Sequence, residues 1–199
     1  KVKLYVKEGE CYKVKDLLYS LLLESHNDTA VVLAEHIAGS TEKFAEMMNK
    51  KAEELGCRNT FFITPNGLDD TKDGRKNEAS AYDMALITKY ALENEIFKEL
   101  IKSKTHTFSD KTGKRTECVN NANRFLDMYE GAIGVKTGFT NDAGYCFVGA
   151  TEGENGRIIA VVLGCGWPPN QNWKWSDTKG LMDYGSANFE RQTLRLETW

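Results

Sequence analysis

The sequence predicts an α+β fold, because helical and strand patterns are segregated along the chain. From residue 14 to about residue 101, apolar side chains recur at the spacing of amphipathic helices. After residue 103 the pattern changes to short extended runs separated by turn signals. A doubly wound fold would alternate strands and helices throughout, so an antiparallel sheet flanked by helices is expected instead.

Cap residues mark the helical part of the chain. Ser40 and Ser80 each stand directly before a helical pattern and are candidate N-caps. The run Asn27-Asp28-Thr29 offers caps for the second helix, and Gly39 ends it. Five helices are expected, at residues 14–24, 30–38, about 41–55, about 81–91 and 96–101.

The extended segments are shorter and lie mostly in the second half. A first strand is expected at residues 3–6, residues 59–63 look extended, and the polar residues 69–78 indicate an exposed loop. Asn155-Gly156 is a strong hairpin signal, because this dipeptide tolerates positive φ. The remaining strands are expected at residues 105–108, 115–119, 144–150 and 157–163, followed by a closing helix at residues 173–189.

The amino-acid composition indicates a single folded domain and argues against nucleic-acid and metal binding. A chain of 199 residues with 41% hydrophobic and 28% charged residues is expected to fold as one domain, residues 1–199. A net charge of −3 gives no basic face for a nucleic-acid partner. The five cysteines have no zinc-ligand spacing, so no metal is expected, and the thiols are expected to be mostly buried and free.

Two short motifs contain residue types suited to catalysis and substrate binding. In Ser25-His26-Asn27, the serine hydroxyl can pass a proton toward a leaving amine, and the asparagine amide can hold a lysine and a substrate carbonyl together. In Lys136-Thr137-Gly138, the lysine and threonine suit a terminal carboxylate. The glycine leaves room for a substrate backbone along a strand edge. Serine acyltransferases of the penicillin-binding and β-lactamase type combine such S-x-N and K-T-G elements with an S-x-x-K nucleophile motif.

Several similar patterns are better explained by structure. Lys111-Thr112-Gly113 falls at a predicted hairpin turn. Ser40-x-x-Lys43 and Ser176-x-x-Lys179 match S-x-x-K, but both follow Ser25 in the chain and lie in helices, where capping explains the first. Ser25, His26 and Asp28 are too close in sequence for a catalytic triad, which converges from distant positions.

Longer runs resemble the D-alanyl-D-alanine carboxypeptidases of the low-molecular-mass penicillin-binding protein family. The resemblance extends in the family's order from about residue 4 to residue 185. The matching runs surround Ser25 and Asn27 and continue through residues 44–56, 59–69, 80–85, 121–124 and 129–140. The family's residue between this serine and asparagine is usually small, whereas this chain has His26.

The resemblance implies a β-lactamase/DD-peptidase-like fold: a five-stranded antiparallel sheet flanked by helices, with a helical lobe. It implies a serine-type carboxypeptidase that removes the terminal D-alanine from peptidoglycan stem peptides through an acyl-enzyme and that binds β-lactam antibiotics. Ser25 and Asn27 are then catalytic, and Lys136, Thr137 and Gly138 bind substrate. No cofactor is implied. The location is the cell envelope outside the cytoplasmic membrane, with membrane attachment only through a C-terminal segment that this sequence does not contain.

The family's nucleophile motif does not precede Ser25 in this sequence. We therefore expect a truncated domain without the N-terminal strand and the nucleophile helix, and an exposed sheet edge in their place. Two other hypotheses remain open: a non-catalytic homologue that binds peptidoglycan peptides, and a β-lactamase-type hydrolase.

The 199-residue chain by itself is expected to form no covalent adduct with a fluorescent penicillin, because a serine cannot attack without an activating partner. A longer gene product with an upstream S-x-x-K is expected to become labelled. Denaturing gel fluorescence measures both, and stoichiometric labelling of a serine in the 199-residue chain would contradict the expectation.

Overall fold

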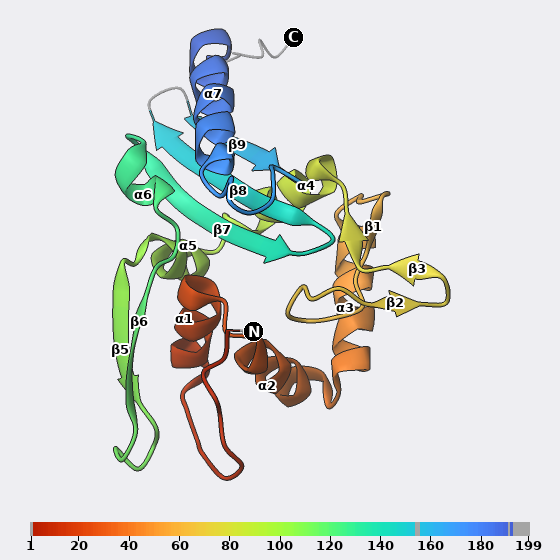
Figure 1. Cartoon of the computed structure of the whole chain (residues 1–199), viewed down its shortest axis with the longest axis vertical. Coiled ribbons are helices and arrows are strands. Elements are labelled where there is room, and N and C mark those ends of the chain that lie inside the picture. Colours follow the sequence, from red (N-terminus) through yellow and green to blue (C-terminus); the bar gives the residue numbers. More distant parts are fainter. Residues whose placement is uncertain (1, 154–155, 191, 193–199) are drawn as a thin grey trace, which may run out of the picture.

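The computed structural model describes residues 2–153, 156–190 and 192. Its elements form two groups, a sheet covered by helices and a helical part that carries two hairpins (Figure 1). The helices are α1 (Val14–Glu24), α2 (Asn27–Ala38), α3 (Thr41–Glu54), α4 (Ala81–Ala91), α5 (Glu95–Lys102), α6 (Phe125–Met128) and α7 (Trp173–Asn188). The strands are β1 (Thr60–Phe61), β2 (Thr71–Lys72), β3 (Arg75–Lys76), β4 (Glu78–Ala79), β5 (Thr105–Ser109), β6 (Thr116–Asn120), β7 (Ala132–Thr140), β8 (Gly144–Gly153) and β9 (Gly156–Val162).

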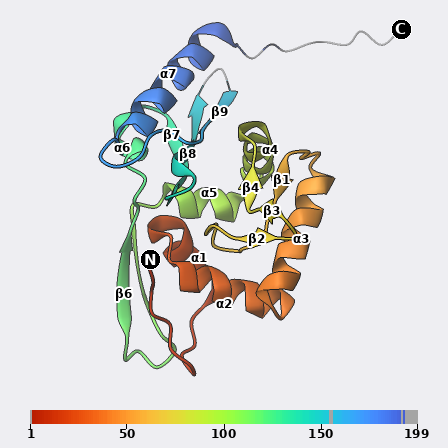
Figure 2. The same ribbon diagram turned by 45° about the vertical axis from the view of Figure 1, so that its right-hand side comes forward.

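The central sheet is antiparallel in the order β7-β8-β9. The helix α7 covers one face, where Trp175 and Met182 pack with Phe147. The helices α4 and α5 cover the other face, where Ile101 packs with Val148. Figure 2 shows α7 on the side of the sheet away from α1 and α2. The α+β class and the expected helices are therefore confirmed, with boundaries shifted by a few residues.

The described part of this sheet has three strands, not the five implied by the resemblance. Both β7 and β9 are edge strands among the described residues, and that one of these edges marks the place of a missing strand stays a prediction. The strand β7 carries Lys136, Thr137 and Gly138 at one of the two edges, as an extended segment. The hairpin turn predicted at Asn155-Gly156 falls partly outside the described residues, although Gly153 pairs with Gly156 across it.

The prediction of a strand at residues 3–6 is wrong. The backbone N–H groups of Leu4 and Val6 donate to the carboxylate of Asp28, at 2.9 and 3.1 Å, instead of to a neighbouring strand. This contact also explains why Asp28 does not cap α2. The helix begins at Asn27 and has His26 at its N-cap, which makes no side-chain cap.

Residues 69–78 are exposed as expected, except for the half-buried Asn77, but they are not simply a loop. They form the short hairpin β2–β3, with Asp73 and Gly74 at positive φ in the turn. Asp-Gly is a recognised hairpin signal, so the sequence contained the information. The two expected caps are confirmed: the Ser40 and Ser80 hydroxyls accept from the backbone N–H groups of Lys43 and Asp83.

The cysteines are free, as expected, but they are not mostly buried. Cys165 is buried, Cys57 and Cys146 are partly buried, and Cys11 and Cys118 are exposed. Within the described residues, no helix is both long and apolar enough to cross a membrane.

Two glycines provide a matched test of the packing between the sheet and α7. A Cβ on Gly149 would lie 2.9 Å from atoms of both Phe147 and Thr178, whereas one on Gly180 would meet nothing within 4 Å. Gly149→Ala is expected to lower the free energy of unfolding by about 1–3 kcal/mol through overpacking. Gly180→Ala, in the helix interior, is expected to raise it by about 0.5–1 kcal/mol. Urea unfolding measures both changes, and equal stabilities would show that the interface is looser than described.

Candidate active site

The structure brings Ser25 and Lys136 together although they are 111 residues apart. Lys136 Nζ donates to Ser25 Oγ at 2.8 Å and to the backbone carbonyl of Thr137 at 2.8 Å. Ser25 directly follows α1, and Lys136 lies in the middle of β7, opposite Val148. The contact therefore joins the helical part to the edge of the sheet.

Ser25 adopts the left-handed conformation, with φ 63° and ψ 38°. Its N–H closes α1 by donating to Leu21 O at 3.0 Å. Glycine usually occupies such a helix end, and a residue with a Cβ is strained there. The conformation stops α1, and only Ser25 and His26 separate α1 from α2. The Ser25 hydroxyl is thereby held at a fixed corner between two helices.

Asn27 lies beside Ser25, but its amide is engaged elsewhere. Asn27 Nδ2 donates to Val2 O at 3.0 Å, and the Asn27 backbone N–H donates to the same carbonyl at 3.1 Å. The described structure shows no hydrogen bond from the Asn27 amide to Lys136. The segment that precedes α1 therefore occupies the amide that the sequence suggested for a lysine and a substrate carbonyl.

Lys136 is only partly exposed, and burial lowers the pKa of its ammonium from 10.5 to about 8. No carboxylate lies within salt-bridge distance of this ammonium in the described part of the chain. A desolvated cation whose neighbours are a hydroxyl and a carbonyl is suited to receive an anion.

Thr137 and Gly138 complete the motif on the edge strand. Because side chains alternate along a strand, Lys136 and Gly138 share one face of β7 and Thr137 lies on the other. Gly138 is exposed, and a Cβ there would meet only Cys146 Cβ, at 3.9 Å. The protein itself would thus tolerate a side chain at Gly138, so the open space is available to a ligand.

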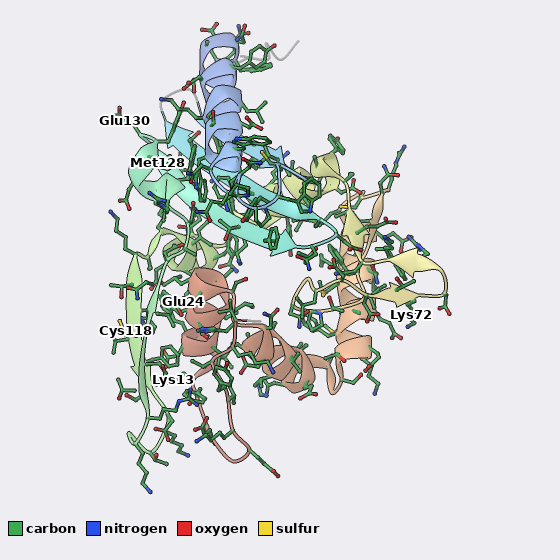
Figure 3. The ribbon with its side chains drawn as sticks, in the orientation of Figure 1. Lys13, Glu24, Lys72, Cys118, Met128 and Glu130 are labelled. Carbon is green, nitrogen blue, oxygen red and sulfur yellow. The ribbon has the colours of Figure 1, made fainter. Side chains whose placement is uncertain are left out.

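The residues beside the C-terminal end of β7 could not be predicted from the sequence. Thr140 Oγ1 donates to Asp69 Oδ1 at 2.8 Å, and Lys76 Nζ lies 3.6 Å from Asp142 Oδ2. These contacts bring residues 69–76, which include the β2–β3 hairpin, beside the end of β7. Figure 3 shows this hairpin projecting outward at Lys72. Residues so distant in sequence meet only in the folded chain.

The second K-T-G motif, at residues 111–113, makes contacts that stabilise a turn. The Lys111 N–H donates to Cys11 O at 2.8 Å, Thr112 hydrogen-bonds to Asp110, and Gly113 has φ 70°. The motif is a turn between β5 and β6, as predicted. Ser176 and Lys179 are exposed on α7, on the other side of the sheet from α1.

The site is an open edge, separate from the cavities. One cavity of about 360 Å³ lies between α6 and α7, and another of about 450 Å³ lies beside α3. Neither is lined by Ser25, Asn27 or Lys136. The described residues contain no group of three or more His, Cys, Asp or Glu side chains that could hold a metal ion.

Comparison with known proteins identifies the family. Residues 1–166 match the family model described as D-alanyl-D-alanine carboxypeptidase. The chain belongs to this family. It is 36% identical over 192 residues to the D-alanyl-D-alanine carboxypeptidase DacF of Bacillus subtilis, covering 96% of this chain and 47% of that protein. It is 35% identical over 183 residues to DacB2 of Mycobacterium tuberculosis, covering 92% of this chain and 61% of that protein.

Solved structures show the same fold for this carboxypeptidase-family chain. The Streptomyces K15 DD-transpeptidase matches with a TM-score of 0.82 at 32% identity, covering 94% of this chain and 72% of that one. Penicillin-binding protein D2 of Listeria monocytogenes, in its cefotaxime-bound form, matches with a TM-score of 0.78 at 30% identity, covering 93% and 71%. The chain spans about half the length of several of its carboxypeptidase relatives. The DD-peptidase-like fold predicted from sequence is confirmed.

The buried lysine of this family member makes stability depend on pH. Between about pH 8 and 10.5, the unfolded chain holds a proton that folded Lys136 has lost, so the free energy of unfolding should rise with pH in this range. The rise is expected to be on the order of 1–3 kcal/mol. Urea unfolding at pH 7.5 and pH 10 measures it. Lys136→Met should reduce the rise, with any remainder expected from Lys174, whose pKa burial also lowers, whereas Lys111→Met should keep the rise in full. A rise of the same size in Lys136→Met would contradict the assignment to Lys136.

Proposed function

We propose that residues 1–199 form the greater part of one penicillin-binding domain of a serine-type D-Ala-D-Ala carboxypeptidase. The single observation that carries the proposal is the contact between Ser25 Oγ and Lys136 Nζ at the edge of β7, in a chain that belongs to this family. The contact unites the two motifs that sequence analysis selected. It also places a partly desolvated cation beside a hydroxyl that can relay a proton.

In this proposal, the terminal D-Ala-D-Ala of a peptidoglycan stem peptide lies along β7. Lys136 faces its terminal carboxylate, with Thr137 as an additional donor, and Gly138 allows the peptide backbone to approach the strand. Asn27 would contact a substrate carbonyl after its amide leaves Val2 O. Because Ser25 is held against Lys136, it is placed to relay a proton to the nitrogen of the leaving D-alanine.

The nucleophile in this proposal belongs to an S-x-x-K motif outside residues 1–199. Its serine oxygen bonds to the carbonyl carbon of the scissile amide, and the amide C–N bond breaks. The departing nitrogen gains a proton and leaves as D-alanine. Water then attacks the acyl-enzyme ester, which releases the shortened peptide and restores the serine hydroxyl. These steps require no redox partner or cofactor.

The same site is proposed to bind β-lactam antibiotics. The supporting observation is similarity to Listeria monocytogenes penicillin-binding protein D2, whose structures carry bound cefotaxime and bound ampicillin. A peptidoglycan substrate would place the protein outside the cytoplasmic membrane, in the cell envelope.

A non-catalytic peptidoglycan-binding homologue is the second candidate. It is favoured by one observation, the engagement of the Asn27 amide with the Val2 carbonyl, which leaves Lys136 with Ser25 and Thr137 alone. A longer gene product that includes an upstream S-x-x-K distinguishes the two candidates by its reaction with penicillin. Covalent labelling by a fluorescent penicillin supports the enzyme. Reversible binding of a D-Ala-D-Ala peptide without labelling supports the binding protein.

The two K-T-G lysines test the site assignment in that longer product. Lys136→Ala is expected to lower kcat/KM for a D-Ala-D-Ala peptide by a factor of about 10²–10³, because a charge facing the carboxylate is lost. Lys111→Ala is expected to change it less than about twofold, since Lys111 lies at an exposed turn far from Ser25. Release of D-alanine measures both. Equal effects from the two substitutions would mean that the wrong motif has been assigned.

A further inference from the structure

The residue between Ser25 and Asn27 is a buried histidine with partners for both ring nitrogens. His26 is 6% exposed. Its Nδ1 lies 2.7 Å from Ser20 Oγ, and its Nε2 lies 3.2 Å from Glu24 Oε2. The imidazole is therefore buried against side chains of α1.

The two contacts of the ring both come from α1. Ser20 Oγ lies at hydrogen-bond distance from Nδ1, and the Glu24 carboxylate lies beside Nε2. Ser20 is fully buried, and its Oγ also lies 3.2 Å from Thr29 Oγ1. The Ser20 hydroxyl therefore links the His26 ring to Thr29 of α2.

Glu24 extends this network to the strand β6. Its Oε1 accepts from the Asn120 N–H at 2.8 Å. Two residues further on, the Ala122 N–H donates to Leu23 O at 3.0 Å. Figure 3 shows Glu24 at the side of α1 that faces β6. The histidine therefore ties together the end of α1, the start of α2 and the segment that follows β6.

We propose that His26 is a positioning residue: its buried imidazole, held between Ser20 and Glu24, keeps Ser25 in the left-handed conformation that directs the hydroxyl to Lys136. This inference deepens the proposed function and rests on it for the role of Ser25. The physical reason is local. Ser25 is the single residue between α1 and the His26 N-cap, so a ring fixed on one side leaves Ser25 little freedom to relax from its strained φ. Without the anchor, Ser25 can move to an ordinary helix end and its hydroxyl leaves Lys136.

Nuclear magnetic resonance on the 199-residue chain tests the geometry without any activity. The ¹³Cα and ¹³Cβ shifts of Ser25 should report the left-handed conformation in wild type and change in His26→Ala. Ser20→Ala removes only the hydroxyl beside Nδ1, and should move the Ser25 shifts in the same direction even if His26→Ala does not fold. Ser25 shifts that stay at their wild-type values in the variants would overturn the proposal.

The longer gene product tests the consequence for catalysis. Per folded enzyme, measured by circular dichroism, His26→Ala should lower kcat at least tenfold with KM changed less than twofold. His26→Asn, which can accept from Ser20, and His26→Gln, which can donate to Glu24, should each restore part of kcat. The matched control is His36→Ala, an exposed histidine on α2, which should leave kcat unchanged.

A purely structural role for His26 would reduce the folded fraction but leave kcat per folded enzyme unchanged, and that result overturns the proposal. If the wild-type longer product shows neither turnover nor penicillin labelling, the proposed function fails. The resonance experiments still decide separately whether His26 holds Ser25.

Discussion

The hydrogen bond between Lys136 Nζ and Ser25 Oγ holds the edge of the sheet against the helical part, and the candidate site depends on it. An ammonium taken out of water needs acceptors, and the described neighbours of Lys136 supply only a hydroxyl and the Thr137 carbonyl. Within residues 2–153, 156–190 and 192, no carboxylate compensates its positive charge. Such a charge at a strand edge attracts an anion and makes the backbone of that strand available to an extended peptide.

Packing of β7 against α5 keeps the contact between Lys136 and Ser25 in place. A Cβ on Gly134 would lie 2.6 Å from Ile101 Cδ1, so β7 approaches α5 as closely as a glycine allows. The Asn121 amide donates to the carbonyls of Ile101 and Ser103, which fixes the end of the same helix. Since α5 also packs on α1 through Leu100 and Leu23, the strand and the serine share a common support.

The corner around Ser25 is held from two further sides. Burial raises the pKa of Asp28, but the N–H groups of Leu4 and Val6 outweigh it and lower the pKa below its usual range. That carboxylate fastens the N-terminal segment across the start of α2 and brings Val2 O to Asn27. The contacts of His26 with Ser20 and Glu24 hold the buried side of the same corner. A substrate that uses the Asn27 amide must therefore displace a backbone carbonyl of the protein itself.

The sequence by itself determined the α+β class, most helix and strand positions, the family and the two motifs, because these follow from local periodicity, cap residues and matched runs. It could not show that Ser25 meets Lys136, that Asn27 turns to Val2, or that Asp69 reaches Thr140, since each contact joins residues far apart in the chain. In the sequence, His26 is a departure from the small residue usual at the rim of the family's site, but the folded chain buries its ring. Only tertiary structure could decide this, because the partners that satisfy both ring nitrogens come from α1, and α1 and α2 must pack before the ring is buried.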